Sequence, residues 1–151
     1  MTDFPYLNSI SSFDCAEAKF VFNRRFKLQS ELVESLWQDT IQWLWLGRYH
    51  QSDSSPKPRS LRIFPALIPV DEMWHAFILC TRRYHDFCRI HFGDYLHHEP
   101  VTENHGDVGP DDLAWQFEYV MSKLGRQYAF RTHIESLLTY EGVIAQCSGG
   151  P

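Results

Sequence analysis

Histidine, cysteine and aspartate are concentrated in one stretch of this sequence, from Asp71 to Pro100. Imidazole nitrogen, thiolate sulfur and carboxylate oxygen are the atoms with which proteins hold transition-metal ions. The stretch contains five of the eight histidines of the chain, namely His75, His85, His91, His97 and His98. This density is the main departure from an ordinary helical domain, and it predicts a metal site.

Two pairs of residues in this stretch have helical spacing. Asp71 and His75 are four residues apart, so they share one face of a helix. His85 and Cys88 are three apart and are expected to do the same. The first pair has two interpretations. Asp71 and His75 are both ligands, or a ligand and a carboxylate that orients it; alternatively they are a plain hydrogen-bonded pair near a helix start.

The ligand set follows from these residue types. We predict that His75 and Cys88 are the first two ligands. One of His97 and His98 is expected to be the third, because loop histidines can swing back to complete a tetrahedral shell. Asp71 is either the fourth ligand or a carboxylate that orients one. Zinc (Zn²⁺) is favoured because it suits mixed nitrogen and sulfur ligands, and an iron site of nitrogen and oxygen ligands is the alternative. The side chains expected around the ligands are those of Trp74, Tyr84 and His85.

The sequence does not reveal a reaction. It contains no HExxH motif, P-loop, dinucleotide-binding glycine fingerprint or nucleophile elbow. A coordination position left open to water would allow hydrolytic or oxidative chemistry. Four protein ligands would instead make the metal structural.

Helices are expected to position these side chains. Apolar residues recur every three to four positions through most of the chain, which is typical of amphipathic helices. Asp71 and Glu72 fit the first turn of a helix, Thr81 is a candidate N-cap, and Gly93 is a candidate stop. The sequence leaves open whether this segment is one bent helix or two. The other predicted helices are residues 13–26, 30–48, 111–124 and 126–140.

Together these segments predict an all-α fold, a single compact domain of about five to seven helices over residues 1–151. A length of 151 residues with 44% hydrophobic and 15% aromatic residues supplies the core of one domain. Residues 51–60 are expected to form a surface loop, and residues 1–10 and 141–151 are expected to fray.

Composition also bears on partners and location. The net charge of −5 argues against general nucleic-acid binding, which requires a basic surface. No apolar run reaches the length of a membrane span, and the first residues do not resemble a secretory signal. Four scattered cysteines without a CxxC pair fit a reducing compartment. We therefore expect a cytoplasmic protein that does not enter a membrane.

The segment from Asp71 to Gly93 resembles the core motif of the glycine-rich-domain-containing-protein-like family. The residues in register with that motif, without a gap, are Asp71, Trp74-His75, Arg83-Tyr84, Cys88 and Gly93. The continuation, His97-His98-Glu99-Pro100, resembles the ending of its small bacterial members. Plant-type members often carry a second histidine where this chain has Phe77, and the glycine-rich extension is missing. The resemblance implies no agreed reaction, but it strengthens the case for a metal or catalytic site, because a packing motif alone rarely requires so many polar residue types in fixed register.

A second hypothesis requires no metal. In it, Asp71, His75, Tyr84 and Cys88 form a buried hydrogen-bond network that fixes two helices. The protein would then be an interaction module, and the surface that binds a protein partner would be the cluster of Trp37, Trp43 and Trp45, if exposed.

Overall fold

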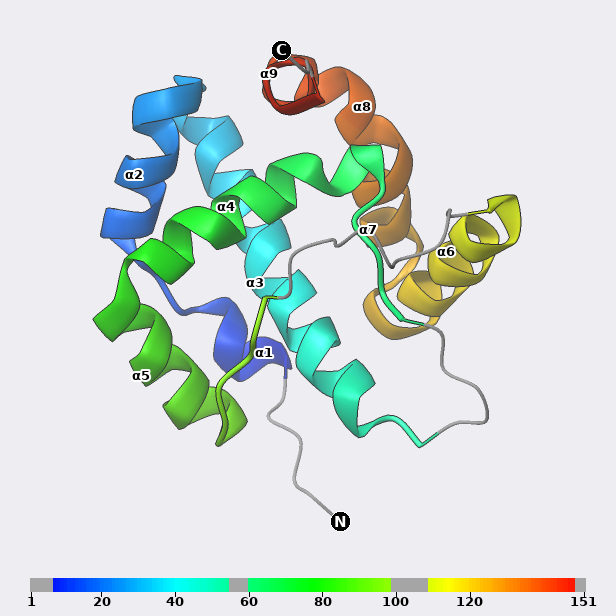
Figure 1. Ribbon diagram of the computed structural model, residues 1–151, viewed down its shortest axis with the longest axis horizontal. Helices are drawn as coiled ribbons and strands as arrows, with labels where there is room; N and C mark the ends of the chain where they lie inside the picture. The colour runs from blue at the N-terminus through cyan, green and yellow to red at the C-terminus, as the bar shows by residue number, and fades with distance from the viewer. Residues whose placement is uncertain (1–6, 55–59, 99–108, 149–151) are drawn as a thin grey trace.

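The chain folds as a succession of helices packed around one long central helix, α3 (Figure 1). The computed structural model describes residues 7–54, 60–98 and 109–148. Within these ranges there is no strand, so the all-α prediction is confirmed. The elements are α1 (Leu7–Ser11), α2 (Ala16–Phe26), α3 (Ser30–Ser52), the 3-10 turn η1 (Pro65–Leu67), α4 (Ile68–Leu79), α5 (Thr81–Phe92), α6 (Pro110–Leu124), α7 (Arg126–Phe130), the π-helical turn η2 (Arg131–Glu135), α8 (Ser136–Thr139) and α9 (Glu141–Ser148).

Three expectations about loops and ends fall partly outside the described residues. They concern the predicted loop 51–60, of which 55–59 are not described, and the two ends expected to fray. Residues 51 and 52 form the end of α3, and α9 occupies most of the segment 141–151. Glu99 and Pro100, the last residues of the resemblance, also lie outside the description.

Helix α3 is central because its apolar residues cover several of its faces. Its buried side chains include Leu36, Trp37, Ile41, Trp43 and Leu44. In Figure 1, α2 and α5 lie on one side of α3, α6 and α7 lie on the other, and α4 crosses it. A helix that buries apolar side chains on several faces must have neighbours on each of those faces.

Helices α4 and α5 meet at a corner, which settles what the sequence left open. Cys80 separates the two helices with a non-helical backbone (φ −83°, ψ 66°). The Cys80 amide still bonds the Phe77 carbonyl at 3.0 Å, and the Cys80 carbonyl accepts the Tyr84 amide at 2.9 Å. The residue that caps α5 is thus Cys80, and Thr81 is the first residue of the helix. Gly93 ends α5 at φ 74°, a left-handed conformation that favours glycine.

Aromatic rings fill the angle between α3, α4 and α5. Phe77 lies at the centre, with its ring centroid 5.1 Å from Trp37, 5.0 Å from Tyr84 and 5.4 Å from Phe87. Phe13 covers Phe87 at 4.8 Å from the segment before α2. Such tilted and edge-on contacts are the preferred packing of aromatic rings. They fix the relative positions of α4 and α5.

The prolines of residues 60–70 are accommodated at a helix start. Pro65 begins the 3-10 turn η1, and Pro69 lies in the first turn of α4, where a missing amide hydrogen costs nothing. Before them, the Arg62 backbone pairs with the side chain of Gln116 in α6. Its amide donates to Gln116 Oε1 at 2.7 Å, and its carbonyl accepts from Gln116 Nε2 at 2.8 Å. These two hydrogen bonds hold the extended segment against α6, and no strand forms there.

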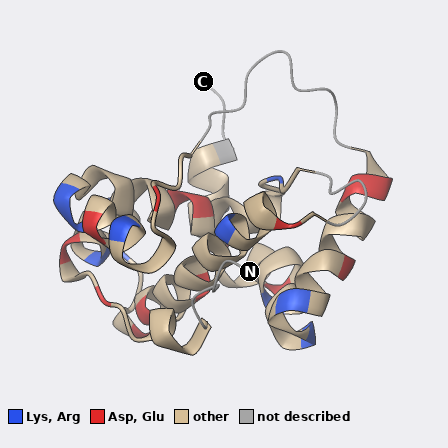
Figure 2. Ribbon diagram, turned by 90° about the horizontal axis from the view of Figure 1, so that it is seen from below, with Lys and Arg blue, Asp and Glu red and all other residues tan. Residues whose placement is uncertain are grey.

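Acidic and basic residues are interspersed along the helices. Figure 2 shows Lys and Arg positions interspersed with Asp and Glu positions over several helices.

Of the helices in the described part of the chain, none has both the length and the apolar character needed to cross a membrane.

Candidate metal centre

Three side chains converge at the side of α4. Asp71 and His75 lie one turn apart on that helix, and His98 reaches them from the segment that follows α5. His98 Nε2 lies 2.5 Å from Asp71 Oδ1 and 3.1 Å from His75 Nε2. The third distance, from His75 Nε2 to Asp71 Oδ2, is 3.4 Å. The three residues therefore direct two imidazole nitrogens and a carboxylate at one point.

Hydrogen bonds alone do not satisfy all of these contacts. An imidazole nitrogen carries either one N–H or one lone pair in the ring plane. If His98 Nε2 donates its hydrogen to Asp71, it has no lone pair left to accept a hydrogen from His75 Nε2. A cation between the three groups would accept a lone pair from each nitrogen and from the carboxylate.

Access to the cluster is from the His75 side. The side chain of His75 is 42% exposed, whereas those of Asp71 and His98 are 18% and 15% exposed. The cluster is thus a half-buried one with an open side, where water or another small ligand can approach.

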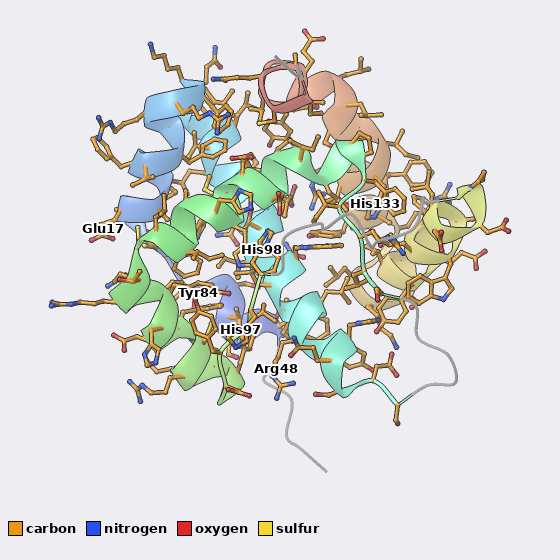
Figure 3. The ribbon with its side chains drawn as sticks, viewed as in Figure 1. Glu17, Arg48, Tyr84, His97, His98 and His133 are labelled. Carbon is orange, nitrogen blue, oxygen red and sulfur yellow. The ribbon has the colours of Figure 1, made fainter. Side chains whose placement is uncertain are left out.

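A buried chain of hydrogen bonds holds the segment that carries His98. The Trp74 indole donates to the Tyr84 hydroxyl at 3.1 Å, and that hydroxyl donates to the Leu96 carbonyl. Tyr84 is fully buried, and burial raises the pKa of its hydroxyl well above the usual value. It therefore stays a donor. The Trp74 ring also packs on His98, with centroids 4.2 Å apart, and Figure 3 shows Tyr84 and His98 near one another beside α4.

A second carboxylate lies behind His75. Glu72 Oε2 is 3.6 Å from His75 Nδ1, the ring nitrogen that faces away from His98, and 3.4 Å from Arg25 Nη1 on α2. A carboxylate at this position favours a hydrogen on Nδ1, which leaves the Nε2 lone pair free for a metal. Glu72 was not among the predicted site residues. Its spacing of three from His75 is the signal that could have identified it.

The other predicted site residues lie apart from this group. Cys88 is 1% exposed and lies under the Leu96 backbone beside Tyr84, where burial raises the pKa of its thiol. The His97 ring packs on Tyr95 at 4.7 Å, and Figure 3 shows His97 apart from His98. His85 is exposed on α5. The structure thus brings together Asp71, His75 and His98, with Trp74 and Tyr84 beside them, and does not bring Cys88, His97 or His85 into the group.

Comparison with known proteins corrects the resemblance stated above. A family model described as UCP032817-like matches residues 58–111 of the chain. The resemblance to the glycine-rich-domain-containing-protein-like family is therefore wrong, because the segment that suggested it matches a different, uncharacterised family. No curated protein matches the chain, and no solved structure does. The matched segment includes α4, α5 and all three residues of the cluster.

A pocket of about 380 Å³ lies next to the cluster, between α3, the segment 60–63 and the segment 96–98. Trp74 and His98 form part of its wall, so His98 belongs both to the pocket and to the cluster. No pattern in the sequence indicates this pocket, since its walls come from distant parts of the chain.

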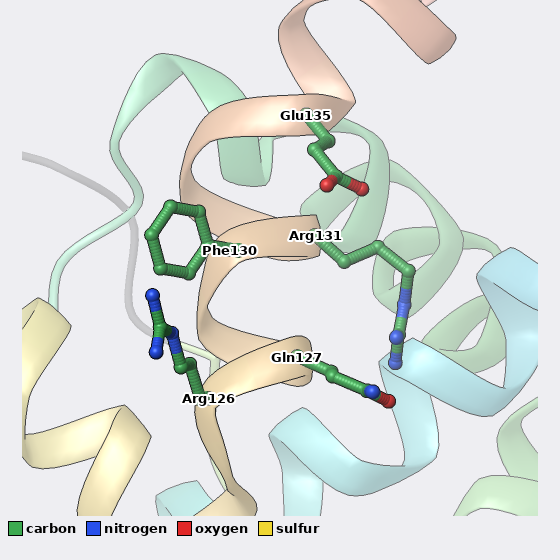
Figure 4. Close-up of a pocket in the computed structure, with 5 residues that line it drawn as sticks. All are labelled: Arg126, Gln127, Phe130, Arg131 and Glu135. Atoms are coloured by element: carbon green, nitrogen blue, oxygen red, sulfur yellow. The ribbon is translucent and has the colours of Figure 1, made fainter.

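A second hollow lies on α7 and η2, far along the chain from the cluster. It is lined by Arg126, Gln127, Phe130, Arg131 and Glu135. In Figure 4 the Arg126 guanidinium lies beside Phe130 while Arg131 points away from it toward another helix. Two guanidinium groups that point apart do not form a convergent site for an anion.

Proposed function

We propose that this chain binds a divalent transition-metal ion through Asp71, His75 and His98. The observation that carries the proposal is the convergence of two Nε2 atoms and one carboxylate within 3.4 Å of one another, in an arrangement that hydrogen bonds alone leave incompletely satisfied. Glu72 behind His75 and the Trp74–Tyr84–Leu96 chain behind His98 support it, because metal-binding histidines are commonly held by such partners.

The donor set bears on which metal binds. Three protein ligands with an open position are typical of catalytic zinc sites. Two histidines and one carboxylate are also the ligands of mononuclear iron(II) oxygenases, so iron remains the alternative. The sequence favoured zinc because of an expected sulfur ligand, but Cys88 does not belong to the group. The proposal of zinc therefore rests on the three-ligand pattern. When bound, such an ion would lower the pKa of a water molecule and polarise a bound oxygen.

The test is a zinc titration of the chelator-treated protein, with elemental mass spectrometry of the protein as purified. We expect one equivalent of zinc to bind. Loss of a hydrogen-bond partner that supports a metal ligand lowers metal affinity about 10–100-fold. His98→Ala removes a ligand itself, so it should lower the zinc affinity by more than that. His97→Ala is the matched control, since the neighbouring imidazole lies outside the cluster, and should bind as the unaltered protein does. Folded protein that binds neither zinc nor iron(II) would refute the proposal.

That negative result would favour the metal-free interaction module. The surface suggested for its protein partner is not available as predicted, because Trp37 and Trp43 are 0% and 3% exposed and belong to the core. A partner would have to bind elsewhere. We also propose a cytoplasmic location, which is supported by the presence of all four cysteines as free thiols.

A further inference from the structure

The pocket beside the cluster has aromatic and aliphatic side chains in its walls. Trp43 from α3, Trp74 from α4 and Leu96 line it with the small part of each side chain that the core leaves open, since they are 3%, 9% and 3% exposed. His98 lines the pocket as well, and its Nε2 atom faces Asp71 and His75. A molecule in the pocket therefore lies directly against one of the proposed ligands of the metal. A volume of about 380 Å³ is within the range of small-molecule sites.

Gly47 keeps the pocket open. It lies well inside the 23-residue helix α3, where glycine costs stability relative to alanine. Its backbone has no positive φ that would require glycine. A Cβ added there would be 3.9 Å from Leu96 Cδ2, an ordinary contact, so a methyl group fits and a longer side chain would enter the pocket. Neither backbone strain nor crowding requires glycine here, and the space that a longer side chain would fill belongs to the pocket.

The charge of the walls limits the chemistry of that occupant. Of the described residues that line the pocket, none is Lys, Arg, Asp or Glu. The polar side chains of the walls include the imidazoles of His50, His97 and His98, which can donate a hydrogen bond to an acidic oxygen. A metal ion on the other side of His98 would be the stronger partner for such a group, since its open positions accept anionic oxygen.

We propose that this pocket binds the substrate of the metal centre, a small flat aromatic molecule that carries an acidic oxygen. This inference rests on the proposed metal binding. The ring lies against the two indoles and Leu96, and the carboxylate or phenolate oxygen is directed past His98 to the metal.

The probe is benzoate, added to the zinc-loaded, ¹⁵N-labelled full chain. Cyclohexanecarboxylate is the control because it has the same carboxylate on a ring that is not flat. We expect benzoate to shift the indole N–H signals of Trp43 and Trp74 and to bind more tightly than cyclohexanecarboxylate. Gly47→Leu should weaken benzoate binding at least about tenfold by filling the pocket, while Gly47→Ala should not. Zinc affinity is measured for both variants, so that a loss of benzoate binding is not confused with a loss of the metal.

Two outcomes would overturn the pocket assignment: equal binding of the two carboxylates, or equal benzoate affinity of Gly47→Leu and the unaltered protein. Failure of the metal proposal looks different. In that case the protein binds no zinc, yet benzoate still shifts the indole signals and Gly47→Leu still abolishes the shift. Such a result would support the pocket as a binding site for flat aromatic acids and refute the metal centre alone.

Discussion

The ring nitrogens of His75 both have carboxylate neighbours, and the two neighbours act differently. Asp71 lies on the Nε2 side together with His98, where a metal would be held. Glu72 lies on the Nδ1 side and is itself within 3.4 Å of Arg25. The sequence spacing of three and four residues on one helix produces this arrangement, because both positions lie on the same face as His75.

Replacing Glu72 tests its role as a positioning residue. Glu72→Gln should lower zinc affinity about tenfold or more, since the ring of His75 loses the charge that favours its Nδ1–H form. The measurement is a competition titration against a zinc chelator. Glu118→Gln, an exposed change on α6, is the control and should leave the affinity unchanged. Unchanged affinity in Glu72→Gln would show that the carboxylate does not orient the ring.

The sequence predicted some members of the cluster and not others. Asp71, His75 and His98 were expected from the sequence and do converge. Cys88 was expected beside His85, but residues three apart on a helix differ by about 60° in direction. On α5 the boundary of the buried face lies between these two directions. Cys88 is therefore buried in the core, and His85 is exposed to solvent. Hydrophobic periodicity locates a buried face, but it does not show which residues at its edge meet another segment.

At the scale of elements, the corner between α4 and α5 and the segment after Gly93 decide where His98 lies. The sequence predicted the stop at Gly93, because glycine marks helix ends locally, but it left open whether the helix breaks near Thr81. It could not predict the path of residues 94–98. That path depends on the Tyr84 hydroxyl, which binds the Leu96 carbonyl from the adjoining helix.

Tyr84→Phe therefore tests the support of His98. The change leaves the Trp74 indole N–H and the Leu96 carbonyl without their buried partner, which should cost about 2 kcal/mol of the free energy of unfolding. It should also weaken zinc binding, because the segment that carries His98 is no longer fixed. Urea denaturation and zinc titration measure the two effects. Tyr95→Phe, on a half-buried ring of the same segment, is the control for stability and affinity.

Loss of stability in Tyr84→Phe with unchanged zinc affinity would show that His98 is held by other contacts, such as its packing on Trp74.

At the scale of the whole molecule, an ion pair joins the C-terminal helices to α3. Arg131 Nε lies 3.1 Å from both carboxylate oxygens of Asp39, and Nη2 lies 2.8 Å from Oδ1. The Tyr128 hydroxyl donates to the Asp39 carbonyl at 2.6 Å. The Asp39 side chain is only 6% exposed, so its charge depends on Arg131.

Arg131→Met should lower the free energy of unfolding by about 3 kcal/mol, because it leaves a buried carboxylate without its partner. The control is Arg126→Met, since Arg126 lines the same hollow but lies over the Phe130 ring. That control should change stability by less than about 1 kcal/mol. Equal effects of the two variants in urea denaturation would show that the Asp39–Arg131 pair contributes no more than a surface contact.

The same end of the molecule contains a buried histidine that should make stability depend on pH. His133, in the π-helical turn η2, is 6% exposed, and burial lowers its pKa to about 4. Gln116 fixes its neutral form. The Gln116 Oε1 atom accepts the Arg62 amide, so Nε2 of Gln116 is the donor to His133 Nε2 at 3.2 Å. His133 Nδ1 lies 2.9 Å from the Thr132 hydroxyl.

The sign of the pH effect follows from the two states. The unfolded chain takes up a proton on this imidazole near its ordinary pKa of about 6.5, whereas the folded chain does so only near pH 4. The contribution of His133 to the free energy of unfolding is therefore fully present above about pH 6.5. It decreases by about 3 kcal/mol as the pH falls to about 4. Urea denaturation at pH 7 and pH 4 measures it, with His133→Gln as the comparison, because glutamine does not titrate and should flatten this part of the profile. An NMR titration that gave His133 in the folded protein a pKa near 6.5 would contradict the prediction, since the folded and unfolded states would then bind protons alike.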